Sequence, residues 1–305
     1  YTSTDYKIMN ETIKDRGLLV ITAGTGINLA LGVLYTWSIF KGAIRQSIEA
    51  GGEGAFNWEL TSLNDPYAVC CLVFACSMML AGTVQDRFGP RITAFIGGLL
   101  VGLGFLWISQ TTDYWGWIFG FGVLVGGGIA FGYSAATPAA LKWFPANKTG
   151  KIAGIVVSGF GLASVYIAPL ATYLLALWGL NDAMLAFGIG FFVLVGLLSF
   201  FLVTPPEGFT PKGYVDRRQT SSSNEEQRAT FVDTSSSPLQ MLRTPTFWLT
   251  WLLYFIGAGA GLMVIGSIAG MAKSSLGEQA FLAVAILAIG NAAGRIVAGI
   301  ASDHY

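Results

Sequence analysis

A single cation stands in a long apolar stretch near the end of the chain. Arg295 is the one charged residue between Ala280 and Ser302, a run long enough to cross a bilayer as a helix. An ionised guanidinium in a membrane costs about 2.5 kcal/mol or more, so such residues usually face a polar cavity and mark a substrate or ion path. Because arginine stays protonated and presents a fork of donors that fits a carboxylate, Arg295 predicts an anion site. The alternative is that its head group only reaches the membrane surface near Ser302.

A polar neighbour accompanies this cation. Asn291 precedes Arg295 by four residues, which places both side chains on one helical face, about 6 Å apart along the axis. Together they could hold a carboxylate and a neighbouring hydroxyl group.

Other reactive groups are scarce. Cys70, Cys71 and Cys76 share one apolar segment without CxxC spacing, and His304 is the only histidine, so we expect neither a metal site nor a cofactor. No HExxH, GxSxG or P-loop spacing occurs, which argues against an enzyme. Formal net charge is zero and no basic patch is present, so nucleic acid is not an expected partner.

Composition places the chain in a lipid bilayer. Hydrophobic residues make up 53% of the 305 and charged residues 11%, with a mean hydropathy of +0.61, unlike an ordinary soluble domain. We expect an all-α integral membrane protein. Apolar length predicts eight spans, at about 17–40, 66–85, 92–110, 114–141, 152–178, 183–204, 246–272 and 280–302.

Lysine and arginine predict the orientation. Most of the 17 lie in the amino-terminal segment, in two connections between spans and in the stretch 205–245, whereas Lys41, Arg45 and Lys273 lie on the opposite side. The positive-inside rule then predicts a multi-pass protein of the cell (inner or plasma) membrane with its N-terminus in the cytoplasm. Residues 41–59 would form the longest external loop. The expected parts are a cytoplasmic segment 1–16, a six-helix bundle 17–204, a cytoplasmic linker 205–245 and the start of a second bundle, 246–305.

A charged turn follows the second span and recurs after the eighth. Its Gly-xxx-Asp-Arg-x-Gly-x-Arg pattern is partly repeated 217 residues later, from Gly299. The glycines allow helices to pack closely and the chain to turn tightly. The aspartate can accept hydrogen bonds from unpaired backbone N–H groups or pair with a basic side chain. Any short hairpin could need such residues, but the recurrence indicates a repeated six-helix unit, as in many secondary transporters. We assign a conformational switch to Gly82, Asp86, Arg87, Gly89, Arg91 and Asp303.

With this motif, the chain resembles the major facilitator superfamily. Within it, four stretches resemble the oxalate/formate antiporter family, which includes bacterial lactate transporters: LGVLYTWSIF at 31–40, GYSAATPAALKWFP at 132–145, GIVVSGFG at 154–161 and GNAAGR at 290–295. The resemblance implies a major facilitator fold with eight of an expected twelve transmembrane helices present. We therefore expect a transporter that lacks spans nine to twelve here; a native eight-span protein is the alternative.

The resemblance also implies a function and a site. It implies a monomeric carrier of small carboxylate anions in the bilayer, either an oxalate/formate type of antiport or a proton-coupled, lactate-like symport. A lysine is expected in the eleventh span. The alternative is a carrier of another solute, such as a sugar or drug, in which Arg295 is structural. The substrate-binding residues that it implies are Arg295, Asn291, Tyr133, Tyr35 and Tyr166, although each tyrosine could instead be a packing residue.

Overall fold

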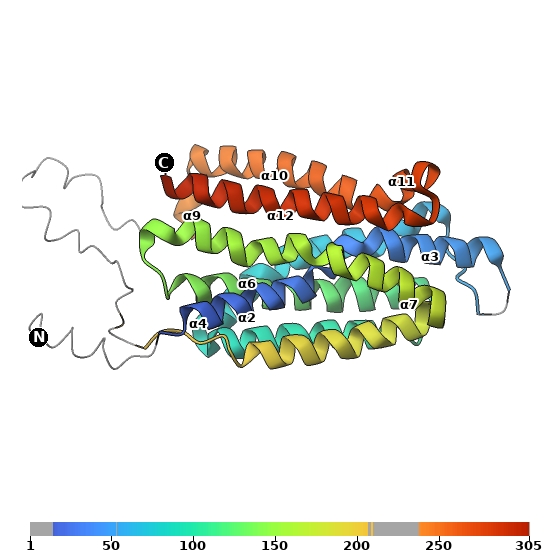
Figure 1. Ribbon diagram of the computed structural model, residues 1–305, viewed down its shortest axis with the longest axis horizontal. Helices are drawn as coiled ribbons and strands as arrows, with labels where there is room; N and C mark the ends of the chain where they lie inside the picture. The colour runs from blue at the N-terminus through green and yellow to red at the C-terminus, as the bar shows by residue number, and fades with distance from the viewer. Residues whose placement is uncertain (1–14, 53, 207–208, 210–237, 305) are drawn as a thin grey trace, which may run out of the picture. The chain divides into compact units, whose positions relative to one another are not determined.

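The computed structural model describes residues 15–52, 54–206, 209 and 238–304, and within these ranges the regular structure is entirely helical (Figure 1). The predicted all-α class is therefore confirmed. The chain divides into two compact units, one formed by Tyr1–Lys212 with Ile265–Tyr305 and the other by Gly213–Val264.

The first span is a continuous helical stretch with a tight turn in its middle. It consists of α2 (Gly17–Leu31), the 3-10 helix η1 (Gly32–Thr36) and α3 (Trp37–Ala50). The prediction of a loop at 41–59 is wrong for residues 41–50, which continue α3. Phe40 and Ile44, one turn apart, are both fully buried, so the same helical face stays packed beyond the predicted end of the span.

Two long helices each contain a sharp turn at a glycine. In α4 (Asp65–Ile108) Gly89 has φ +80°, and in α7 (Thr149–Ser199) Gly179 has φ +78°, a region that side-chain-bearing residues rarely adopt. Pro90 follows Gly89. Proline has no backbone N–H, and it is favoured at the start of a helix because the first N–H groups there have no partner within the helix. Each helix is therefore two membrane spans, as the apolar lengths predict.

The fourth span also combines several helical forms. It is built from α5 (Tyr114–Trp117), the π-helical η3 (Ile118–Val125) and α6 (Gly126–Leu141). Short 3-10 helices, η2 (Leu60–Asn64) and η4 (Ala146–Lys148), precede α4 and α7.

The remaining helices follow the predicted linker. Most of that linker, 207–208 and 210–237, lies outside the described residues. The second unit contains α9 (Pro238–Met241) and nearly all of α10 (Pro245–Ile265), whereas α11 (Ile268–Leu276), η6 (Gly277–Ala280) and α12 (Phe281–His304) belong to the first. The seventh span was expected to reach 272. It ends at Ile265 instead, because a Gly-Ser pair at 266–267 interrupts the helix.

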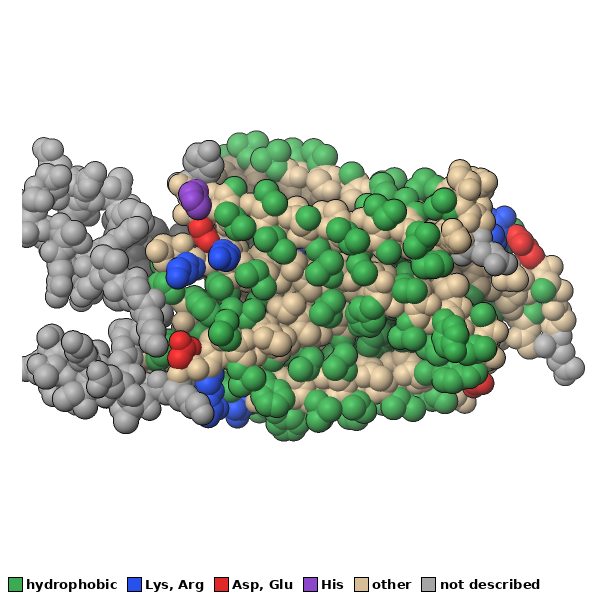
Figure 2. All heavy atoms as spheres, in the orientation of Figure 1, with side chains coloured by type: hydrophobic (Ala, Val, Ile, Leu, Met, Phe, Trp, Pro, Cys, Tyr) green, Lys and Arg blue, Asp and Glu red, His purple; other side chains and the backbone are tan. Residues whose placement is uncertain are grey.

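The outer surface suits a bilayer. Among the described residues, six helical stretches are long and apolar enough to cross a membrane, and the turns at Gly89 and Gly179 divide two of them, which gives the eight predicted spans. On α4, Leu72, Met79 and Leu80 are 64%, 75% and 65% exposed. Figure 2 shows hydrophobic side chains along the first unit on this face, with Lys, Arg, Asp and Glu gathered towards its ends. Lipid tails would solvate such a surface.

Glycines allow the helices of the first unit to approach closely. A Cβ on Gly97 of α4 would lie 2.6 Å from the backbone nitrogen of Gly132 and 2.7 Å from the carbonyl oxygen of Gly128, both on α6. Small residues four apart are typical of tight helix pairs in membranes.

We predict that Gly97→Ala destabilises the protein by about 1–3 kcal/mol, because α4 and α6 must separate to admit the methyl group. Gly190→Ala is the matched control, since Gly190 also lies inside a helix but has open space around it. Thermal unfolding in detergent measures the difference. Equal unfolding temperatures for the two variants would contradict the close approach.

Candidate functional site

The guanidinium of Arg295 is held by two neutral oxygens. Its Nε donates to Asn291 Oδ1 at 2.7 Å, one turn earlier on α12, and its Nη2 donates to the Tyr35 hydroxyl at 3.0 Å. The side chain is half-buried. In the described part of the chain Arg295 forms no ion pair; the one salt bridge found there joins Arg45 to Glu49. The positive charge of Arg295 is therefore oriented by these partners but not neutralised by them.

The turn in the first span presents Tyr35 to this cation. A Cβ on Gly32 would overlap the carbonyl oxygen of Phe160 and the side chain of Ala163, so η1 lies directly against α7. Three residues later, the Tyr35 ring packs edge-on against Phe160, with centroids 4.9 Å apart, and is 8% exposed. Packing thus fixes the ring while its hydroxyl reaches the guanidinium.

Glycines on α7 likewise make room for α12. A Cβ on Gly154 would lie 2.8 Å from the carbonyl oxygen of Arg295, and one on Gly161 would lie 3.0 Å from Asn291 Oδ1. Figure 1 shows α12 running alongside α7. The backbone of α12 is therefore pressed against α7 where the two polar residues project.

The other predicted tyrosines lie elsewhere. Tyr133 contacts Phe160 at 5.5 Å between centroids, and Phe74 contacts Tyr133 at 5.8 Å, so a row of aromatic rings leads from Tyr35 across the bundle. Sequence reasoning missed Phe160, although it lies in the family-like stretch 154–161. Tyr166 donates its hydroxyl to the carbonyl oxygen of Leu29 at 3.1 Å.

Asn28 of the first span is a fully buried polar residue. Its Nδ2 donates to the carbonyl oxygen of Val156 at 2.8 Å, so it joins the first span to α7.

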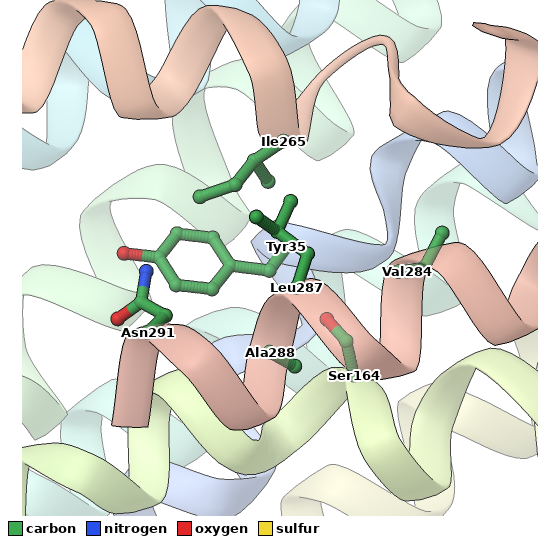
Figure 3. A pocket seen from close by; sticks show the side chains of 7 residues that line it. All are labelled: Tyr35, Ser164, Ile265, Val284, Leu287, Ala288 and Asn291. Atoms are coloured by element: carbon green, nitrogen blue, oxygen red, sulfur yellow. The ribbon is translucent and has the colours of Figure 1, made fainter. Parts of the chain in front are cut away.

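A small cavity is lined in part by Tyr35 of η1 and Asn291 of α12 (Figure 3). Its enclosed volume is about 10 Å³, which is room for roughly one water molecule. One end is polar, at Tyr35 and Asn291, and most of the remaining wall is apolar. The lining residues are Tyr35, Ser164, Ile265, Val284, Leu287, Ala288 and Asn291. Tyr166 is not among these residues.

The end of α12 caps the start of α7. Asp303 Oδ1 accepts from the backbone nitrogen of Gly150 at 2.6 Å, and Oδ2 accepts from that of Lys151 at 2.7 Å. These donors lie in the first turn of α7, where backbone N–H groups lack partners within the helix and favour an anion. Gly299 contacts Gly150 at the same place. The second copy of the charged turn therefore joins two helices far apart in the sequence.

The first copy has different surroundings. Asp86, Arg87 and Arg91 are exposed, and Asp86 has no hydrogen-bond partner within the described ranges. The expectation that Gly82 permits close helix approach is wrong for these ranges, because a Cβ on Gly82 would meet no atom within 4 Å. Gly89 makes the expected turn.

The amino-acid sequence matches a known protein family. The family model described as Major Facilitator Superfamily matches residues 17–305. The chain belongs to the major facilitator superfamily. The predicted relationship is thus confirmed, and the helices described above form part of a major facilitator fold.

Known proteins from several organisms are similar to this chain over half of its length or more. The uncharacterized MFS-type transporter YhjX of Escherichia coli (strain K12) is 30% identical over 90% of this chain and 63% of its own length. The oxalate:formate antiporter of Oxalobacter formigenes is 26% identical over 85% of this chain and 55% of its own length. Apicoplast pyruvate carrier 1 of Toxoplasma gondii is 26% identical over half of this chain and 34% of its own length. The chain spans less than two thirds of each of these relatives.

We predict that Asp303→Ala loosens the start of α7. Losing a cap typically costs about 0.5–2 kcal/mol, so amide exchange at Gly150 and Lys151 should quicken roughly 2- to 30-fold if local opening limits it. Hydrogen-exchange mass spectrometry of the peptide around residue 150 measures this. Asp182→Ala is the control, since Asp182 is exposed and has no hydrogen bond in the described structure. Unchanged exchange in Asp303→Ala would contradict the capping role.

Proposed function

We propose that the protein is a secondary transporter that carries small carboxylates across a membrane by alternating access. The observation that carries this proposal is the state of Arg295, an arginine inside an apolar helix. Its hydrogen-bond partners in the described chain, Asn291 and Tyr35, are both neutral, and both line a small cavity. Burying a charge without an opposite charge is unfavourable, so an anion entering the cavity would be stabilised there.

The neighbours of Arg295 suit carboxylate binding. Asn291 and Tyr35 hold one edge of the guanidinium in a fixed orientation, leaving other N–H groups for a ligand. A carboxylate that accepts from two of them would gain a pair of charge-assisted hydrogen bonds. The rings of Tyr35 and Phe160 would limit water around the bound anion, which strengthens its electrostatic attraction. Tyr133 and Tyr166 remain predicted substrate-binding residues. Tyr133 is linked to Tyr35 by the ring of Phe160, which contacts both.

The charge of Arg295 also suggests the transport cycle. Without substrate Arg295 is an unpaired cation next to two residues that line the cavity, and this charge would hinder passage through the closed intermediate state. Binding of the anion would remove this obstacle. Such a cycle suits exchange of one anion for another, or symport of an anion with a proton. The names of the oxalate:formate antiporter and the pyruvate carrier support carboxylates as the solute class.

The arrangement of α7 and α12 suggests which contact opens. On the proposed orientation, with the N-terminus in the cytoplasm, the bonds from Asp303 to α7 close the cytoplasmic end between the bundles 17–204 and 246–305. Opening to the cytoplasm would break them. By its matching spacing, we assign Gly82, Asp86, Arg87, Gly89 and Arg91 to the same switch. The protein would work as a monomer in the cell membrane.

We predict that Arg295→Ala and Arg295→Lys abolish counterflow of labelled carboxylate into vesicles that contain the full protein. Alanine removes the charge, and lysine keeps it but lacks the rigid fork that pairs with both carboxylate oxygens. Counterflow with oxalate, formate and lactate measures the effect. Repeating it with an imposed pH gradient distinguishes symport from exchange.

Arg45→Ala is the matched control, because Arg45 is exposed and pairs only with Glu49 in the described structure. It should transport as the unchanged protein does. Full transport by Arg295→Ala would disprove the carboxylate site. Competition by neutral solutes rather than carboxylates would instead indicate a sugar or drug carrier with a structural Arg295.

A second prediction concerns the switch. Asp86→Asn should slow counterflow while equilibrium binding of the carboxylate changes less than about twofold, since Asp86 is exposed and is not among the residues that line the cavity. Binding is measured by calorimetry in detergent and counterflow in vesicles. Loss of binding in Asp86→Asn would contradict a role in the conformational change alone.

A further inference from the structure

The contact between a cation and an amide at Arg295 has a counterpart on α3. Lys41 donates its Nζ to Asn64 Oδ1, on the last residue of η2, at 3.0 Å. The side chain of Lys41 is partly buried. Like Arg295, Lys41 forms no ion pair in the described part of the chain, so its bonded partner is neutral and its charge is not cancelled.

Carboxylates that are close to these two residues in the sequence are bonded elsewhere. Asp65, next to Asn64, accepts from the Tyr114 hydroxyl at 2.7 Å. Glu49, on the same helix as Lys41, is paired with an arginine. Lys41 therefore keeps a positive charge on a side chain that has lost part of its water, which favours binding of a further anion.

The two asparagines present their donors in the same way. An ammonium group can only donate, so Asn64 turns its amide oxygen towards Lys41 and its NH2 group away from this bond. Asn291 does the same when its Oδ1 accepts from Arg295. Each pair thus offers a charged N–H donor beside a neutral amide donor, a combination that fits the two oxygens of a carboxylate.

An apolar contact separates the two cations. Tyr35, which bonds Arg295, and Lys41 lie on one continuous helical stretch, about 9 Å apart along its axis. Between them, Ile39 packs against a buried cluster that includes Val284, and Val284 also lines the cavity with Tyr35. Lys41 therefore lies beyond the contact that covers the cavity, towards the end of the first unit opposite to the C-terminal end of α12 (Figure 1).

We propose that Lys41 and Asn64 form an outer binding site for the carboxylate, which the anion occupies before it reaches Arg295. On the proposed orientation, this end of the first unit faces away from the cytoplasm. The inference rests on the proposed carboxylate transport and adds a second site to it. Because the site lies outside the apolar contact, it can fill while the path to Arg295 is closed, and it raises the concentration of the anion at the entrance.

The test measures how fast Lys41 of the full protein reacts with an amine-reactive reagent, read by mass spectrometry of its peptide. A bound anion covers the Nζ atom and keeps it protonated, whereas only the unprotonated amine reacts. Replacing chloride by oxalate, formate or lactate at constant ionic strength should slow the reaction of Lys41 roughly three- to tenfold. Lys273 of α11 is the matched control, because it is exposed and forms no hydrogen bond in the described structure. Its rate should change less than about twofold.

Two variants separate the outer site from Arg295. In Arg295→Ala the carboxylate should still protect Lys41, since the two sites are distinct. In Asn64→Asp the protection should disappear, because the new carboxylate pairs with Lys41 and cancels its charge. Aspartate has nearly the size of asparagine and is equally favoured before a helix, so this change leaves the fold intact. Counterflow in the same variant, at low salt and well below saturation, should fall roughly threefold, and this deficit should vanish at high salt, which screens exposed charges.

The outcomes separate this inference from the function on which it rests. Equal rates for Lys41 in chloride and in all three carboxylates would overturn it, as would equal protection of Lys273, since the effect would then be general. Protection that disappears in Arg295→Ala would also overturn it, because Lys41 would then only report binding at Arg295. Undiminished counterflow in Asn64→Asp would overturn the place of the site on the transport path. If no carboxylate shows counterflow while Lys41 is protected, the proposed function fails and the outer anion site stands.

Discussion

The structure depends on placing one positive charge in an apolar helix with no opposite charge bonded to it in the described chain. Asn291 and Tyr35 direct their oxygens at Arg295, and such dipoles reduce the cost of removing a guanidinium from water without cancelling its charge. A carboxylate at either position would neutralise the cation and remove its attraction for an anion. Neutral partners instead orient the N–H donors of Arg295 and leave its positive electrostatic potential available to an anion. An anion-binding site in a membrane needs both properties.

Holding that charge in place requires helices that touch through their backbones. In a bilayer, apolar side chains gain little by leaving lipid, so close packing and hydrogen bonds must join the helices. Gly154 and Gly161 admit α12 against α7, and Gly32 admits η1 against the same helix, which brings Tyr35 within reach of Arg295. The glycines therefore serve the site although none of them bonds the cation. A methyl group at any of them would move a polar residue.

Apolar length predicted the eight spans, because hydropathy reports what lipid requires of a segment. It did not predict where helices end when packing decides: α3 continues to Ala50 because Phe40 and Ile44 are buried, and a Gly-Ser pair ends α10 at Ile265. The pairing of Asn291 with Arg295 follows from helical spacing. The contact of Arg295 with Tyr35 joins residues 260 apart, so only resemblance to a family could suggest it. Nothing local indicated Phe160, since its contacts with Tyr35 and Tyr133 come from the opposing helices.

The two copies of the charged turn show the same limit. Gly299 and Asp303 have the spacing of Gly82 and Asp86, yet only the former pair contacts a helix start in the described chain. In each copy the glycine leaves the helix surface free of a side chain, and the aspartate carboxylate one turn later can accept hydrogen bonds. A function arises when another helix brings unpaired N–H groups to that acceptor. Because such a contact consists of hydrogen bonds at a helix end rather than an interlocked core, it can break and re-form without unfolding either helix. This property suits a transporter that must open at one end while its helices remain intact.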